Sequence, residues 1–195
     1  MTRILVAYAT MAGSTAEVAR TIANELASNR VEVDVLPIGE VAGLEPYAAV
    51  VVGAPMILGW HRSARRFLRK HRRAFRHIPL AVFATAMSLT ATGETMIDGV
   101  PVFVDESLPK PPAQAGRLSF RERYATIPNY FRPVLKAVRP ARPVRLGIFG
   151  GRLEYGRLKW WAVLFAMLIV KAQAGDKRNP HSIRAWAAGL PELFS

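Results

Sequence analysis

Short apolar runs alternate with amphipathic segments along most of the chain. The run RILVAY, residues 3–8, has the apolar content of a buried strand. Within residues 13–29 the apolar positions then recur three and four apart, the spacing of one helix face. VEVDVLP, residues 31–37, alternates apolar and polar positions and ends in proline, which predicts a second strand. The first 37 residues therefore predict one β-α-β unit.

Three further apolar runs continue this pattern. AAVVVGAP, residues 48–55, is apolar throughout, as expected for a parallel strand that is covered on both faces. PLAVFATAM and PVRLGIFGG, residues 79–87 and 143–151, predict a fourth and a fifth strand. The spacing of apolar residues places helices near residues 64–78, 128–138, 158–172 and 181–190.

The alternation lapses between residues 88 and 120. Four prolines lie in this stretch, so we expect an irregular insertion after the fourth strand. Five strands alternating with helices predict a doubly wound α/β fold around a parallel sheet. The chain has 195 residues, shows no internal repeat and no domain boundary, and is therefore expected to form a single domain over residues 1–195.

Positive charge sets this chain apart from an average globular protein. It has 27 Lys and Arg against 14 Asp and Glu, a formal net charge of +13. HRSARRFLRKHRRAFRH, residues 61–77, places eight of these cations between Arg62 and Arg76, and no acid occurs between Glu45 and Glu94. Such a segment attracts anionic lipid or an acidic substrate, although a solvated helix face is the plain alternative. We expect no nucleic-acid partner, because interleaved exposed aromatic residues are missing.

A second unusual segment is the apolar run WWAVLFAMLIV, residues 160–170. Its 11 residues are too few to span a bilayer as a helix, which takes roughly 20. It is apolar on all sides, with Trp160 and Trp161 at one end, so its second face needs a partner. That partner would be the last helix, a second copy of the chain, or the head-group region of a membrane.

The absence of cysteine and the pattern of the first residues narrow the chemistry and the compartment that we expect. Without cysteine there are no disulfides, thiolate metal sites or cysteine nucleophiles, and no metal site is predicted. Met1 is followed almost at once by a strand pattern rather than a secretory signal. We therefore expect a cytoplasmic protein.

The break between the first strand and the first helix is the strongest candidate site. Thr10, Ser14 and Thr15 offer hydroxyls, Gly13 permits close backbone approach, and the free amides of a helix start attract anions. Neither GxGxxG nor GxxxxGK[ST] is present, which favours a single terminal phosphate over a dinucleotide or triphosphate. The alternative is an ordinary helix cap made by Ser and Thr.

This segment carries a family resemblance. VAYATMAGSTAEVARTI, residues 6–22, resembles the FMN-binding signature of flavodoxins, with departures at Ala7, Met11 and Ala12. Two later stretches, VVVGAPMILGWHRSARRFLRKH (50–71) and GGRLEYGRLKWW (150–161), resemble the flavodoxin-like menaquinone-dependent protoporphyrinogen dehydrogenases. The resemblance implies a flavodoxin-like five-stranded sheet in the order 2-1-3-4-5, with the insertion after strand 4.

The same resemblance implies which residues bind FMN. The phosphate would be held by Thr10, Met11, Ala12, Gly13, Ser14 and Thr15. One side of the isoalloxazine ring would be bordered by Ala54, Pro55, Met56, Ile57, Leu58, Gly59 and Trp60, and the other by Thr85, Ala86, Met87 and Ser88. Trp60 is the only aromatic residue in these loops, and it would either stack on the ring or cover the neighbouring helix.

The function implied is an FMN-dependent oxidoreductase that passes electrons from a reduced organic substrate, with protoporphyrinogen IX as the candidate, to a quinone. Trp160, Trp161 and the basic residues would contact the inner face of the cell membrane. A flavin performs the hydride chemistry itself, so the sequence identifies no catalytic side chain with certainty. His61 is a weak candidate, and the alternative is that it is an ordinary surface histidine. The alternatives are a flavodoxin-type electron carrier, or a flavin-less basic module that binds membrane or nucleic acid.

Overall fold

The computed structural model describes residues 1–28, 30–56, 59–114, 116–153 and 175–194. At its centre lies a seven-stranded sheet in the order β2-β1-β3-β4-β9-β7-β6. The predicted order 2-1-3-4-5 corresponds to its first five members and is confirmed. Their bounds are β2 Val31–Pro37, β1 Thr2–Tyr8, β3 Ala49–Pro55, β4 Leu80–Ala86 and β9 Arg145–Gly150. All five run parallel to one another.

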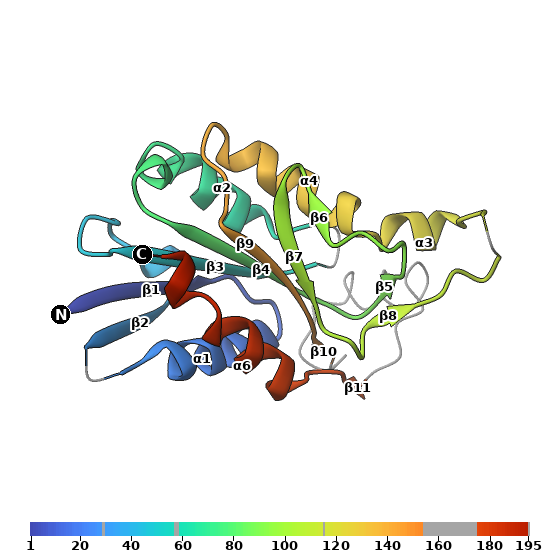
Figure 1. Ribbon diagram of the computed structural model, residues 1–195, viewed down its shortest axis with the longest axis horizontal. Helices are drawn as coiled ribbons and strands as arrows, with labels where there is room; N and C mark the ends of the chain where they lie inside the picture. Colours follow the sequence, from blue (N-terminus) through green and yellow to red (C-terminus); the bar gives the residue numbers. More distant parts are fainter. Residues whose placement is uncertain (29, 57–58, 115, 154–174, 195) are drawn as a thin grey trace.

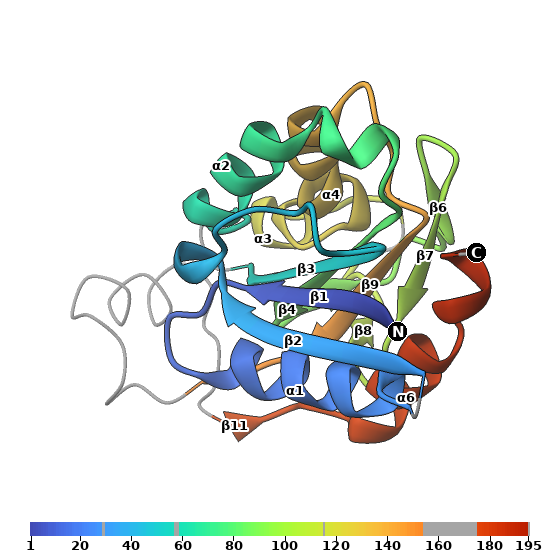
Figure 2. The same ribbon diagram turned by 90° about the vertical axis from the view of Figure 1, so that its left-hand side faces the viewer.

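Helices cover both faces of this sheet (Figures 1 and 2). On one face lie α2 and α4, and on the other lie α1 and α6. Every residue of β3 and β4 is buried, because these central strands are covered from both sides. The bounds of the helices are α1 Ser14–Leu26, α2 Arg62–His71, α4 Ile127–Val138 and α6 Pro180–Ala188.

Successive strand residues divide between two hydrophobic cores. Val50 and Val82 belong to the core beneath α2 and α4, where Phe131 is fully buried. Val51 and Phe83 belong to the core beneath α1 and α6, where Trp186 is fully buried. A strand points alternate side chains to opposite faces, so an unbroken apolar run supplies both cores at once.

The insertion expected after the fourth strand is present, but residues 88–120 are irregular only in part. This stretch contains β5 Leu89–Thr90, β6 Met96–Ile97, β7 Val100–Val104 and β8 Pro109–Lys110. β7 pairs in parallel with β9 and extends the main sheet, while β6 pairs antiparallel with β7 at the edge. The prolines hid these strands, because Pro has no N–H to give to a sheet ladder. Pro101 is tolerated near the start of β7, where it pairs with Met96 of β6 and precedes the residues that pair with β9.

One buried carboxylate joins this added strand to the rest of the fold. Asp105 follows β7 and is 0% exposed. Its carboxylate accepts hydrogen bonds from Ser107 Oγ at 2.9 Å, from Asn179 Nδ2 at 3.3 Å and from Ser182 Oγ at 3.3 Å. The end of β7 is thereby attached to the start of α6, and the buried charge is satisfied by several donors.

One predicted helix is shorter than the apolar spacing indicated, and one helix was not predicted. The basic segment forms α2 only as far as His71 and continues into a short 3-10 turn, η2 Ala74–Arg76. A further helix, α3 Phe120–Tyr124, precedes α4 and begins with a capping box between Ser119 and Glu122. The helix expected over 158–172, with Trp160 and Trp161, falls outside the described residues. The remaining elements are η1 Ile38–Glu40, β10 Arg152–Leu153, β11 Gly175–Asp176 and η5 Pro191–Leu193.

In the part of the chain that the structure describes, no helix has both the length and the apolar content needed to cross a membrane.

The packing of β3 against β4 predicts that Gly53→Ala destabilises the protein. A Cβ at Gly53 would lie 1.9 Å from Cζ of Phe83, whose side chain is fully buried. The ring cannot move aside without displacing its neighbours, so we expect the free energy of unfolding to fall by about 1–3 kcal/mol. Urea unfolding followed by circular dichroism measures this change.

Two further variants test the cause of that loss. Gly53→Ala combined with Phe83→Leu should recover part of the stability, because the shorter side chain leaves room for the methyl group. Gly39→Ala is the matched control, since nothing lies within 4 Å of a Cβ at that position. An unchanged urea midpoint for Gly53→Ala would show that Gly53 and Phe83 are not packed as described.

Candidate functional site

The ends of four parallel strands define one edge of the sheet. Because β1, β3, β4 and β9 run in the same direction, the residues that follow them gather at this edge, where doubly wound folds bind their ligands. A cavity of about 40 Å³ lies there. It is lined by Met11, Ala12, Ser14, Thr15, Pro55, Met56, Thr85, Ala86, Met87, Gly151 and Arg152. All three segments that the sequence singled out therefore contribute to one cavity.

The loop between β1 and α1 has the geometry of an anion site. Gly13 adopts a φ of 90°, in the left-handed region that favours glycine, and its N–H donates to Thr10 Oγ1 at 2.9 Å. Among the described residues no side chain caps the start of α1. The hydroxyls of this loop therefore do not serve as an ordinary helix cap, and the helix start retains donors for an anion.

A buried hydrogen bond fixes this loop to the end of β4. Oγ1 of Thr15 and Oγ1 of Thr85 are 3.0 Å apart, and both side chains are buried. The backbone N–H of Met56 in turn donates to the carbonyl of Thr85 at 2.8 Å. Thr85 thus links the start of α1, the segment after β3 and the end of β4.

Gly151 and Arg152 are the two lining residues that the sequence analysis missed, and Arg152 is the charged one. Its Nη2 lies 3.2 Å from Oε1 of Glu17, in the first turn of α1, and Arg178 pairs with the same carboxylate. Arg178 also binds Asp176 and holds the pKa of that carboxyl down at about 2. The two arginines offset the charge of Glu17, which would otherwise repel an anion at the start of the helix. The signal in the sequence was a cation directly after the glycine pair that ends the fifth strand.

Trp60 and His61 do not line the cavity. The side chain of Trp60 is 2% exposed and packs in the core with α2, which favours the covering role over ring stacking. Its Nε1 is buried and has no hydrogen-bond partner among the described residues. His61 precedes α2, its Nδ1 lies 2.8 Å from Ser63 Oγ, and burial lowers its pKa, so it is neutral at pH 7.

The remaining predicted residues take different positions. Ala54 is buried within β3, and Gly59 adopts a φ of 82° in the loop before α2. Ser88 follows β4 without lining the cavity. Ile57 and Leu58 lie outside the described residues. No cluster of three His, Asp or Glu side chains that would hold a metal ion occurs in the described ranges.

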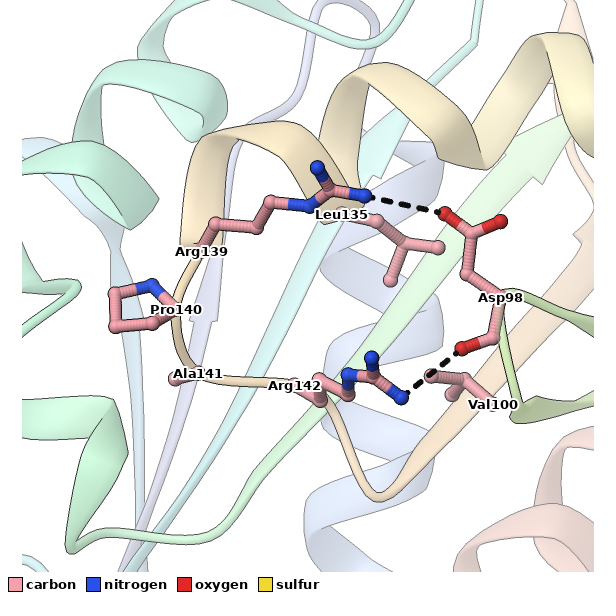
Figure 3. Close-up of a pocket in the computed structure, with 7 residues that line it drawn as sticks. All are labelled: Asp98, Val100, Leu135, Arg139, Pro140, Ala141 and Arg142. Carbon is pink, nitrogen blue, oxygen red and sulfur yellow. Dashed lines mark hydrogen bonds and ion pairs between the residues drawn. The ribbon is translucent and has the colours of Figure 1, made fainter.

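A second cavity, of about 170 Å³, lies near the start of β9 and the β6–β7 turn (Figure 3). Arg139 Nη2 lies 3.8 Å from Asp98 Oδ2, and Arg142 Nη1 donates to the Asp98 carbonyl at 3.4 Å (Figure 3). The three charged residues of this lining, Asp98, Arg139 and Arg142, are therefore engaged with one another.

Comparison with known proteins agrees with this arrangement. The model of the flavodoxin domain family matches residues 5–179. Protoporphyrinogen IX dehydrogenase [quinone] of Escherichia coli K12 is 23% identical over 177 residues, which cover 89% of this chain and 82% of that enzyme. The same enzyme of Escherichia coli O157:H7 gives the same values. A short-chain flavodoxin associated with a PDU bacterial microcompartment superposes with a TM-score of 0.54 at 13% identity, covering 100% of both chains. That last likeness shows the fold.

The position of Arg152 predicts that Arg152→Ala weakens the binding of FMN. The loss of one cation beside a phosphate should raise the dissociation constant roughly tenfold at low salt and less at high salt. Fluorescence titration of FMN at two salt concentrations measures both effects. Arg20→Ala, on the exposed side of α1, is the matched control and should bind like the wild type. Equal FMN affinities of the two variants would show that Arg152 does not contribute to the binding of the phosphate.

Proposed function

The chain belongs to the flavodoxin domain family, and on that premise we propose that it binds FMN and passes electrons from a reduced organic substrate to a quinone. The observation that carries the proposal is the single cavity where the loop before α1 meets the segments after β3 and β4. The relative that is 23% identical acts, by its name, on protoporphyrinogen IX with a quinone as acceptor, which supports a porphyrinogen as substrate.

The residues of the cavity fit an FMN phosphate. Its volume of about 40 Å³ suits a phosphate-sized group, since one water needs roughly 10–15 Å³ on the same measure. The amides at the start of α1 and the hydroxyls of Thr10, Ser14 and Thr15 would donate to the phosphate oxygens. The ring would lie at the mouth, with the segment after β3 on one side and the segment after β4 on the other.

The chain would supply position and charge rather than a proton-transfer pair. Bound flavin supplies two-electron chemistry, in which the substrate gives up two hydrogens and the quinone gains two to become a quinol. Arg152 is the one ionisable side chain in the described lining of the cavity, and a guanidinium offers hydrogen-bond donors but no acceptor. The apolar side chains of Met11, Met56 and Met87 would limit the access of water.

The basic surface of α2 supports contact with an anionic membrane. Its buried face consists of Ala64, Phe67 and Leu68, so the charges lie outside. A groove of about 710 Å³ between α2 and η1 is lined by five cations, Arg62, Arg65, Arg66, Arg69 and Lys70. None of these five forms an ion pair with an acid in the described ranges. We propose that this surface, together with Trp160 and Trp161, brings the flavin to a membrane quinone.

The proposed phosphate site predicts that FMN binds far more tightly than riboflavin, which lacks the phosphate. We expect the dissociation constant of FMN to be about tenfold to a hundredfold lower than that of riboflavin, because the helix start and several hydroxyls would stabilise the bound phosphate. Ser14→Glu should bring the affinity for FMN down to that for riboflavin, since a carboxylate in the loop repels the phosphate. Ser28→Glu, beyond the end of α1, is the control. Flavin absorbance and fluorescence measure both ligands.

The outcomes separate the proposal from its rivals. If FMN does not bind, both the oxidoreductase and the electron carrier are excluded, and a flavin-less module remains. If FMN binds but the protein does not oxidise a porphyrinogen with a quinone as acceptor, the electron carrier is favoured. Quinone-dependent turnover would establish the proposed activity.

The membrane contact predicts binding to anionic vesicles that weakens with salt. Each basic residue near the surface contributes about 1 kcal/mol, so Arg66→Ser/Arg69→Ser should lower the vesicle-binding constant roughly thirtyfold at low salt. Trp160→Glu/Trp161→Glu should also reduce co-sedimentation, whereas Arg30→Ser, in the turn before β2, should not. Equal sedimentation of all four proteins, or equal binding to neutral vesicles, would contradict the proposed membrane contact.

A further inference from the structure

Two tyrosines lie together where α3 passes into α4. Tyr124 is the last residue of α3 and Tyr130 lies in the first turns of α4. Their rings meet edge to face, with centroids 6.5 Å apart and an angle of 80° between the ring planes. Although six positions separate them in the sequence, the two rings form one packed unit.

The two hydroxyls contact different loops of the candidate site. The N–H of Gly59, in the loop after β3, donates to Oη of Tyr124 at 2.5 Å. Oη of Tyr130 donates to the carbonyl of Ser88, in the loop after β4, at 2.8 Å. These are the two loops between which the flavin ring is proposed to lie. The tyrosine pair therefore reaches both sides of the proposed slot.

The pair is itself held firmly in place. The carbonyl of Tyr124 accepts a hydrogen bond from Asn129 Nδ2 at 2.7 Å. The segment after β4 is bound to the same connection, because the N–H of Thr90 donates to the carbonyl of Ala125 at 2.7 Å. Tyr130 is only 3% exposed, and burial raises the pKa of both phenols, which therefore remain neutral hydrogen-bonding groups at physiological pH.

The loops are thus joined at two levels. At their base the N–H of Met56 donates to the carbonyl of Thr85, and further out the tyrosine pair spans from Gly59 to Ser88. We propose that Tyr124 and Tyr130 are positioning residues that set the width of the slot between these two loops. The inference rests on the proposed function for its ligand, FMN, and on the described contacts for its geometry.

The test compares Tyr124→Phe, Tyr130→Phe and the double variant with the wild type. Each substitution removes one hydroxyl and keeps the ring contact. Tyr47→Phe is the matched control, because it removes a hydroxyl that donates to Asp34 at 2.8 Å beside β1 and β2. The measurements are the FMN dissociation constant, the visible circular dichroism of bound FMN, and the amide exchange of Gly59 and its neighbours in the flavin-free protein.

Each single variant should weaken FMN binding by about threefold to tenfold, the value of one hydrogen bond, and change the visible circular dichroism. The double variant should lose less FMN affinity than the product of the two single losses, because releasing one loop already allows the width of the slot to change. Gly59 exchange should accelerate by about fivefold or more in Tyr124→Phe, while Tyr47→Phe changes none of the three.

The results that overturn the inference are distinct from those that overturn the proposed function. Unchanged Gly59 exchange and unchanged FMN affinity in the tyrosine variants reject the positioning role. The role is also rejected if the loss of FMN affinity in the double variant equals the product of the two single losses. A wild-type protein that binds no FMN rejects the proposed function instead. Faster Gly59 exchange in Tyr124→Phe would still support the control of the slot by the tyrosine pair in that case.

Discussion

The parallel register of β1, β3, β4 and β9 is the constraint on which the candidate site depends. A parallel sheet requires each strand to return by a crossover, so the turns that follow the strands all lie along one edge. Thr85, at the end of β4, shows the consequence, because it forms hydrogen bonds both to Thr15 at the start of α1 and to Met56 after β3. The site is therefore a product of the same pairing that builds the core.

The added segment between β4 and β9 serves both the sheet and the site. β7 lengthens the sheet beyond β9, and the buried Asp105 attaches its end to α6. The same segment ends in α3, whose last residue reaches back to Gly59. The insertion is ordered because it joins the main sheet. It therefore provides a fixed point from which α3 can hold a loop at the strand ends.

The distribution of charge separates the roles of the cations. At the start of α1, Arg152 and Arg178 offset the carboxylate of Glu17, so the loop offers backbone and hydroxyl donors without strong repulsion of an anion. The larger basic surface lies on α2, where the buried face is apolar and four of the five cations are exposed, with Arg65 half-buried. A protein with a net charge of +13 can thus keep its proposed phosphate site separate from a surface suited to a polyanion.

The sequence by itself determined the five parallel strands, the crossover helices between them and the loop at residues 10–15, because these follow from local periodicity and from the residue types of a single turn. The tertiary structure alone decided three things. It paired β7 with β9 across more than forty residues and buried Trp60 in the core. It also placed Arg152 in the lining of the cavity and bonded the two tyrosines to Gly59 and Ser88. These outcomes depend on contacts between distant segments, and local spacing carries no information about which distant segment a side chain will meet.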